Sequence, residues 1–282
     1  MELSLWLAES PSKRNGELLF LAYSPVWITI LLGVIVPFKF YEEFQELEYF
    51  AVALMLSSPC IVLPFFLKSR LANLWIGIFG FAGNYFLTHY FYTILGANYT
   101  FPSWRLNNLC YRSPCTQPYF LLYHVFSSMT LRRLKAAQAK TSSVAFSRLV
   151  QFVSTAILAY LTALIEALTI SNLFFIHSDF LSSSHIFPAF YKVGSLLYAL
   201  YFIVSYPMFM RIDEDPSDEW SFLRTTGNAL AASMLVTILL DFWRLTIGPV
   251  VDQHHHSWFQ QERKLARIFL WKRYKSHPFH IL

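Results

Sequence analysis

One carboxylic acid, Glu166, lies in the middle of an otherwise apolar run, AYLTALIEALTISN. An apolar setting disfavours the charged form of a carboxyl group, so Glu166 is expected to keep its proton near neutral pH. A carboxyl held in that state can act as a general acid. The alternative is a buried glutamate that only hydrogen-bonds a neighbouring helix, but ionisable residues at membrane depth are functional by default.

Two histidines in apolar runs are candidates for moving a proton. His89 follows Tyr85 by four residues, which places the two on one helical face, whereas Asn84 is five residues away from His89. His89 can relay a proton or orient a hydroxyl group; the alternative is a structural histidine whose hydrogen bonds are satisfied. His124, which follows Tyr123 in a later run, is a further candidate under the same two interpretations.

A second carboxylate, Asp241, lies three residues before Arg244 in the run LLDFWRL. That spacing puts the two side chains next to each other on a helix. The simpler interpretation is an ion pair at membrane depth. If Asp241 is paired elsewhere, it is instead the second carboxylate of a site.

Motifs for metal or nucleotide chemistry are lacking. The sequence contains no HExxH, no glycine-rich phosphate loop and no serine-centred elbow. Three adjacent histidines at 254–256 do not enclose a metal ion, so no metal site is predicted. Cys110 and Cys115 share one loop and can either pair or remain free thiols.

Membrane-spanning helices must position these residues, because the composition excludes a soluble domain. Of 282 residues, 55% are hydrophobic and only 14% charged, against about 25% charged in soluble domains. The mean hydropathy is +0.41. We predict an all-α, polytopic transmembrane bundle of about seven spans, each near the roughly 20 residues that a bilayer requires. The predicted spans are 18–38, 49–67, 73–95, 119–134, 149–176, 191–210 and 226–247.

Charge is concentrated outside these spans. Much of the net charge of +5 lies in residues 132–148 and 263–275, which indicates contact with the membrane surface and its lipid rather than with nucleic acid. Arg132 and Arg133 are expected to extend to that surface. The acidic run 211–220, RIDEDPSDEW, is expected to form a solvated turn or a helix start. We divide the chain into a transmembrane domain, 1–250, and a basic tail, 251–282.

Several long and unusual stretches resemble the cycloeucalenol cycloisomerase family, the cyclopropyl sterol isomerases of plants. Among them are VPFKFYEEFQELEY, ANLWI, LGANYTFPSW, YKVGSLLYALYFIVS and ALAASMLVTILLDFWRL. The similar stretches run from about residue 4 to residue 250. They cover nearly all of the chain except its tail.

The resemblance implies an enzyme of sterol biosynthesis in the endoplasmic reticulum membrane. Family members open the 9β,19-cyclopropane ring of cycloeucalenol to give obtusifoliol, and they need no redox cofactor. The cyclopropyl sterol substrate and membrane lipid are the implied partners, and the oligomeric state is left open. Because a cyclopropane is a very weak base, opening its ring needs a strong, positioned acid in a dry site.

On this interpretation the polar residues take roles in ring opening. Glu166 or Asp241 is the acid, and His89 is the base or relay, with His124 as a further catalytic candidate. The substrate-binding candidates orient the sterol or line its site with aromatic rings; they are Asn84, Tyr85, Tyr123 and Trp243.

Three other interpretations remain open. The chain departs from the family in a short turn at 67–73 and beyond Pro249, so a non-catalytic sterol binder or an inactive variant of the same fold is the main alternative. An isomerase acting on another cyclopropyl sterol, such as cycloartenol, differs only in substrate. A seven-helix receptor or transporter would be supported by internal repeats or paired broken helices, which the sequence does not show.

Overall fold

The computed structural model describes residues 6–67, 69–94, 109–138, 143–173 and 193–248, and every regular element within them is helical. This confirms the all-α prediction. The π-helical turn η2 (Leu31–Ile35) continues the first helix, and the α-helices are α1 (Pro11–Ile30), α2 (Phe40–Glu43), α3 (Glu46–Phe66), α4 (Arg70–Ile94), α5 (Leu109–Gln138), α6 (Val144–Leu173), α8 (Ser195–Met210) and α9 (Phe222–Thr246).

Four of the described helical segments are long and apolar enough to cross a membrane: Pro11–Ile35, Glu46–Phe66, Val144–Leu168 and Phe222–Thr246. The chain is therefore a membrane protein, as its composition indicates. Helix α8 is apolar but only 16 residues long. The prediction of about seven spans goes beyond these four.

Local sequence explains where the first two long helices begin. The first starts at Pro11 rather than near residue 18, and a proline fits the first turn because no helical partner exists there for a backbone N–H. Helix α3 starts with a capping box between Gln45 and Glu48, and it continues through Pro59 and Pro64. Between Phe66 and Arg70 only a short turn separates α3 from α4, as predicted. The tail, the histidines at 254–256 and the side chains of residues 109–115 lie outside the described residues.

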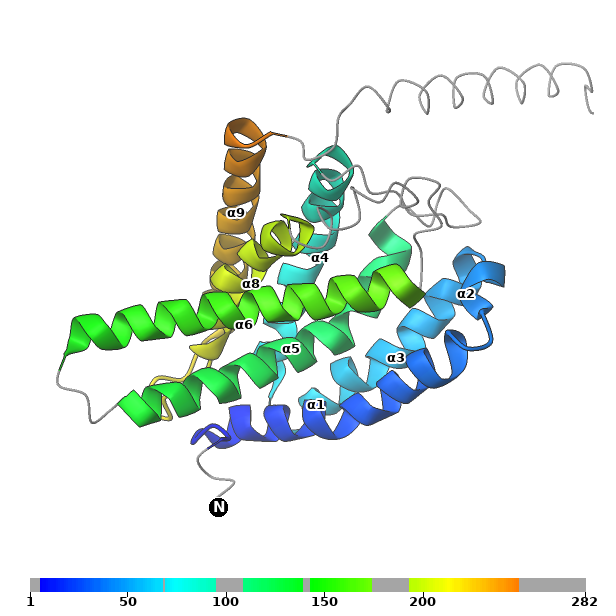
Figure 1. Cartoon of the computed structure of the whole chain (residues 1–282). Coiled ribbons are helices and arrows are strands. Elements are labelled where there is room, and N and C mark those ends of the chain that lie inside the picture. Colours follow the sequence, from blue (N-terminus) through cyan, green and yellow to red (C-terminus); the bar gives the residue numbers. More distant parts are fainter. Residues whose placement is uncertain (1–5, 68, 95–108, 139–142, 174–192, 249–282) are drawn as a thin grey trace, which may run out of the picture.

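Helix α5 is the centre of the bundle (Figure 1). It packs against α1, α3, α4, α6 and α8. Helix α6 packs chiefly against α8, and α9 packs chiefly against α4. The bundle therefore has two helix pairs, α6 with α8 and α4 with α9, arranged around α5.

Aromatic rings fill the interior between α4, α5 and α8. Trp75 and Phe79 of α4 stack with centroids 4.8 Å apart, and Phe209 of α8 meets Trp75 edge-on at 5.6 Å. The indole Nε1 of Trp75 donates to Asn228 Oδ1 at 2.8 Å. Because a buried indole N–H needs a partner, this hydrogen bond helps to fix α4 against α9.

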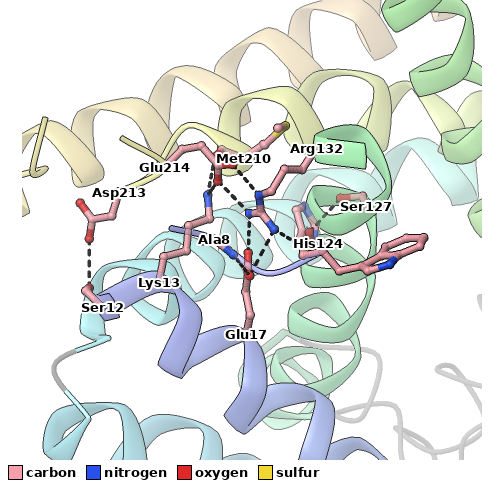
Figure 2. Close-up of polar contacts among 11 residues, drawn as sticks. Ala8, Ser12, Lys13, Glu17, His124, Ser127, Arg132, Met210, Asp213 and Glu214 are labelled. Carbon is pink, nitrogen blue, oxygen red and sulfur yellow. Dashed lines mark hydrogen bonds and ion pairs between the residues drawn. The ribbon is translucent and has the colours of Figure 1, made fainter. Parts of the chain in front are cut away.

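A charge network joins the N-terminal helix to the turn between α8 and α9 (Figure 2). Arg132 Nη2 donates to Glu17 Oε1 at 2.8 Å, and Arg132 Nε donates to Glu214 Oε1 at 2.6 Å. Lys13 Nζ pairs with Glu214 Oε2 at 2.8 Å. The side chains of Glu17 and Arg132 are only 2% and 13% exposed. The network therefore fixes α1, α5 and the turn together at one end of the bundle.

One prediction about this end of the molecule was wrong, and another was confirmed only in part. Arg132 does not extend to the surface, because Glu17 and Glu214 hold it inside. Nor is the acidic run wholly solvated: Asp213 is buried and accepts hydrogen bonds from the Trp220 backbone N–H at 2.8 Å and the Ser12 hydroxyl at 3.3 Å. The remaining acids of the run, Asp215, Asp218 and Glu219, are exposed.

We expect acid to weaken the charge network. Burial by itself raises the pKa of Glu214, but its hydrogen bonds to Arg132 and the charge of Lys13 lower that pKa below the ordinary value of 4.5. The stabilisation is therefore complete above the ordinary pKa and is lost as the pH falls through the lower pKa of the folded state. Thermal unfolding in detergent, followed from neutral pH to about pH 3, should show this loss of Tm.

The variant Glu214→Gln should flatten the acid part of that profile, because glutamine does not titrate. Glu219→Gln is the matched control, since Glu219 is exposed in the same turn. An acid-dependent Tm that persists unchanged in Glu214→Gln would contradict this prediction.

Gly83 of α4 provides the space for Tyr201 of α8. A Cβ atom at position 83 would lie 2.9 Å from Cε1 and 3.1 Å from Cζ of Tyr201, and it would overlap the hydroxyl group. Tyr201 is 2% exposed and has little room to move away. We expect Gly83→Ala to destabilise the protein by about 1–3 kcal/mol, measured as a lower Tm in detergent.

Gly227→Ala is the matched control, because no heavy atom lies within 4 Å of a Cβ built at position 227 of α9. Alanine there should be neutral or slightly stabilising, since it favours a helix interior over glycine. Equal Tm values for the two variants would contradict the close contact at Gly83.

Candidate active site

Small residues on α6 bring Glu166 close to α8. Ala159 and Ala163 are fully buried, and together with Thr155 and Glu166 they recur every three or four residues on one face of α6. This spacing forms a single helical face. Because short side chains let two helices approach closely, the face packs along α8 and carries Glu166 to it.

Two tyrosines of α8 bind polar groups of α6. Tyr198 Oη donates a hydrogen bond to Glu166 Oε2 at 2.9 Å, and both side chains are buried. Two turns further along α8, Tyr206 Oη donates to Thr162 Oγ1 at 2.9 Å. The carboxyl group is thus held in a defined direction inside the bundle.

Further aromatic side chains lie near this carboxyl group. Tyr123, Tyr201 and Tyr206 lie within electrostatic range of Glu166. The Phe202 ring lies 5.0 Å from the Tyr198 ring and stacks on Tyr206, also at 5.0 Å. Aromatic faces stabilise a nearby cation by about 0.5–2 kcal/mol. The site therefore combines an acid with a lining suited to positive charge.

His124 lies beside the tyrosine cluster and is 0% exposed. Its Nδ1 is 2.7 Å from the carbonyl oxygen of Phe120, so this nitrogen carries a proton and donates it. Its Nε2 is 2.9 Å from Ser205 Oγ, and in the neutral ring Nε2 accepts from that hydroxyl group. The ring also meets Tyr206 edge-on at 5.1 Å. The structure thus brings His124 next to the Glu166 cluster.

Other predicted site residues lie on α4, away from this cluster. His89 and Tyr85 are both exposed, and their rings meet edge-on at 5.8 Å. Asn84 Nδ2 donates to Thr116 Oγ1 of α5 at 3.0 Å. Asn84 is thus bonded to α5, whereas Glu166 is bonded to Tyr198 of α8.

Asp241 forms the ion pair that its spacing predicts. Arg244 Nη2 lies 2.8 Å from Asp241 Oδ1, and Tyr90 Oη donates to the same oxygen at 3.3 Å. Both members of the pair are well exposed, at 40% and 49% of their side chains. The neighbouring Trp243 is partly buried and packs against the core. This group lies between α4 and α9, again apart from Glu166.

Five residues of the cluster around Glu166 were not predicted as site residues: Tyr198, Tyr201, Phe202, Ser205 and Tyr206. A signal for them exists in the run SLLYALYFIVSYPMFM. Tyr198, Tyr201, Ser205 and Phe209 follow one another at intervals of three or four residues, which is the spacing of one helical face. A polar and aromatic face on an apolar helix points into a bundle rather than to lipid.

A cleft of about 810 Å³ opens near one end of the same helices. It lies between α5, α6, α8 and the acidic turn, and both apolar and charged side chains line it. Thr155 lines the cleft and precedes Glu166 by eleven residues, or about 16 Å along α6. Glu166 itself does not line the cleft.

Comparison with known proteins confirms the resemblance seen in the sequence. The chain is 47% identical over 264 residues to a curated protein of Arabidopsis thaliana named cycloeucalenol cycloisomerase, and the match covers 88% of this chain and 91% of that protein. No family model matches the chain, and neither does any solved structure. Identity of this level and extent shows that the chain belongs to the cycloeucalenol cycloisomerase family.

Proposed function

We propose that this protein opens the cyclopropane ring of cycloeucalenol to give obtusifoliol, in the endoplasmic reticulum membrane. One observation carries the proposal: a buried carboxyl group, Glu166, is oriented by Tyr198 and lies near further aromatic rings. The family relationship supplies the substrate class. The buried acid supplies the group that this substrate needs, because a strained carbon–carbon bond is opened only by a well-placed proton donor.

Glu166 is the general acid in this proposal. Its proton is transferred to the methylene carbon of the cyclopropane, the bond between that carbon and the ring junction breaks, and its electron pair forms the new C–H bond. The methylene carbon becomes a methyl group, and the ring-junction carbon is left positively charged. Loss of a proton from the adjacent carbon to a base then forms the 8,9 double bond, so one proton enters and one leaves.

The aromatic lining stabilises the carbocation that ring opening produces, and the exclusion of water protects it. Phe202 and the tyrosines around Glu166 present rings whose faces attract positive charge. Burial also keeps water from adding to the cation, which would give an alcohol instead of an alkene. Tyr198 acts as a positioning residue, since its hydroxyl group holds the Glu166 carboxyl.

We assign the proton-accepting role to His124 rather than to His89. In the neutral ring of His124, the lone pair on Nε2 is directed at the Ser205 hydroxyl, and the ring adjoins Tyr206 within the cluster. His89 is exposed on α4. Asp241 is paired with Arg244, so we assign the role of the acid to Glu166 instead. Tyr123, on the same helix as His124 and near Glu166, is the residue best placed to orient the sterol.

The proposal includes a topology of about seven spans. Besides the four long apolar segments, α4 and α5 have 25 and 30 residues, which is sufficient length for a bilayer. Helix α8 is short, but its central packing against α5, α6 and α9 places it inside the bundle. The transmembrane domain then comprises residues 1–250, followed by the basic tail.

A product assay tests the function directly. The full chain is expressed in yeast, cycloeucalenol is supplied to isolated membranes, and obtusifoliol is sought by mass spectrometry against an empty-vector control. A parallel incubation with cycloartenol tests substrate preference. We expect obtusifoliol to form. Saturable binding of cycloeucalenol to verified, membrane-inserted protein without any product would overturn the proposal and favour a non-catalytic sterol binder.

A further inference from the structure

The cleft between α5, α6, α8 and the acidic turn is lined by charged side chains, some of which form ion pairs and some of which do not. Four acids line it; two of them form ion pairs, and a third is hydrogen-bonded to neutral groups within its own turn. Glu214 belongs to the charge network, and Asp218 Oδ1 lies 2.6 Å from Arg224 Nη1. Asp215 accepts hydrogen bonds from the backbone N–H and the hydroxyl of Ser217. Glu9 is the fourth acid, exposed at the rim.

Three cationic side chains of the cleft have no ion-pair partner among the described residues. Lys135 comes from the end of α5, Arg148 from the start of α6 and Arg211 from the turn after α8. All three are exposed, and none has an ion pair or a hydrogen bond from its side chain within the part of the chain that the structure describes. Three cations brought together from three separate elements form a site for an anion, and the arginine fork matches a phosphate group.

Part of the lining of the cleft is apolar. This apolar lining consists of Leu131, Ile203, Pro207 and Met210, which are buried or half-buried, and Phe152, which is exposed. The volume of about 810 Å³ lies within the range of small-molecule sites, about 300–1,000 Å³. A free inorganic phosphate would leave this apolar lining uncovered, whereas a lipid covers it with acyl chains.

The rim has the features of the membrane–water interface. Trp220 lines the cleft, and the guanidinium of Arg224 lies over its ring, 4.3 Å from the centroid. Tryptophan gathers at the level of lipid headgroups, and basic side chains there attract anionic lipid. An anionic group at the rim with an apolar body below it is the arrangement of a phospholipid.

We propose that this cleft binds an anionic phospholipid, whose phosphate is held by Lys135, Arg148 and Arg211 and whose acyl chains lie on the apolar lining. The site differs from that of the sterol. A sterol carries a hydroxyl group and no charge, so it does not call for three cations. The cleft is also about 16 Å along α6 from Glu166, which keeps its occupant away from the reacting carbons. The proposal therefore goes beyond the proposed isomerase function and does not depend on it.

Native mass spectrometry of the purified full chain tests the site. The protein in detergent is titrated with palmitoyl-oleoyl phosphatidylserine, and separately with the phosphatidylcholine of the same acyl chains. We expect retention of phosphatidylserine over phosphatidylcholine. The double variant Arg148→Gln/Arg211→Gln should weaken phosphatidylserine binding by about tenfold or more, since basic residues near a membrane surface attract anionic lipid.

Arg14→Gln is the matched control, because Arg14 is an exposed cation of α1 that does not line the cleft. Wild-type affinity for phosphatidylserine in the double variant, or an equal loss in Arg14→Gln, would overturn the proposal. Phe152→Arg provides a second test, because it introduces a charge into the apolar lining of the cleft. This variant should no longer retain lipid. A free phosphate does not need the apolar lining, so it would still bind.

Competition separates the other possible occupants. Inorganic phosphate that displaces the lipid at equal concentration would identify a free-anion site, and cycloeucalenol that displaces it mole for mole would identify a sterol site; either result would overturn the proposal. Turnover of cycloeucalenol is measured on the same samples. Failure of the isomerase assay with intact phosphatidylserine binding would leave this proposal standing and remove only the proposed function.

Discussion

Replacing Glu166 by glutamine should lower the turnover of cycloeucalenol by about 10²–10⁴-fold, the usual contribution of a general acid. Glutamine keeps the size of the side chain and can still bond to Tyr198, so the fold should survive. What it lacks is the acidic proton that the cyclopropane must receive. The measurement is the rate of obtusifoliol formation per mole of folded protein in membranes, with the amount of each variant determined by immunoblot.

Asp241→Asn is the matched control, since it changes another carboxylate of a long apolar helix in the same way. Asp241 is paired with Arg244 and exposed, so its variant should retain most of the activity. Tyr198→Phe should cause a smaller loss than Glu166→Gln and should act on kcat more than on KM, because it releases the acid without removing it. Near-normal turnover in Glu166→Gln together with an inactive Asp241→Asn would transfer the acid's role to Asp241.

The largest loss of stability should come from replacing Arg132 by methionine. Arg132 bonds both Glu17 and Glu214, and Glu17 is 2% exposed. Removing one partner of a buried pair leaves a charge without compensation, which costs about 3–5 kcal/mol. The variant should therefore unfold at a clearly lower temperature in detergent, as followed by fluorescence-detected size-exclusion chromatography.

The adjacent arginine provides the control. Arg133 lies over the ring of Trp6, 5.1 Å from its centroid, and has no ion pair within the described residues. Arg133→Met should change the Tm only slightly. The double variant Glu17→Gln/Arg132→Met should lose less stability than the two single variants added together, because the uncompensated charge is then gone. Indistinguishable Tm values for Arg132→Met and Arg133→Met would contradict a stabilising role for the network.

Some of the site could be predicted because its signal is local. Glu166 stands out as the one acid in a long apolar run, and membrane depth makes such a residue conspicuous whatever the rest of the fold. Asp241 and Arg244 are three residues apart, so helical geometry alone predicts that they meet. His124 was identified as a polar group at depth, although its partner Ser205 is 81 residues away and could not be predicted with it.

The other features of the fold and of the site could not be predicted from the sequence, because they depend on which helices are neighbours. Arg132 at the end of an apolar run is expected to extend to water unless a distant carboxylate reaches it first, and Glu17 lies 115 residues away. His89 is as polar and as deep in its run as His124, yet it lies on an exposed face of α4 while His124 faces the core. Periodicity shows that a helix has faces, but packing determines which face is inside.

The charge network also sets an order of events during synthesis of the chain. Ser12 bonds Asp213 and Lys13 bonds the carbonyl of Met210, contacts between residues 201 and 197 positions apart. A ribosome adds about 5–20 residues per second, so the first helix waits roughly 10–40 s for these partners. Helix α1 thus gains these contacts only late in synthesis. A chain that ends before Glu214 retains a buried Lys13 without its ion-pair partner, so the end of the bundle that the charge network holds together forms only after the turn between α8 and α9 has been made.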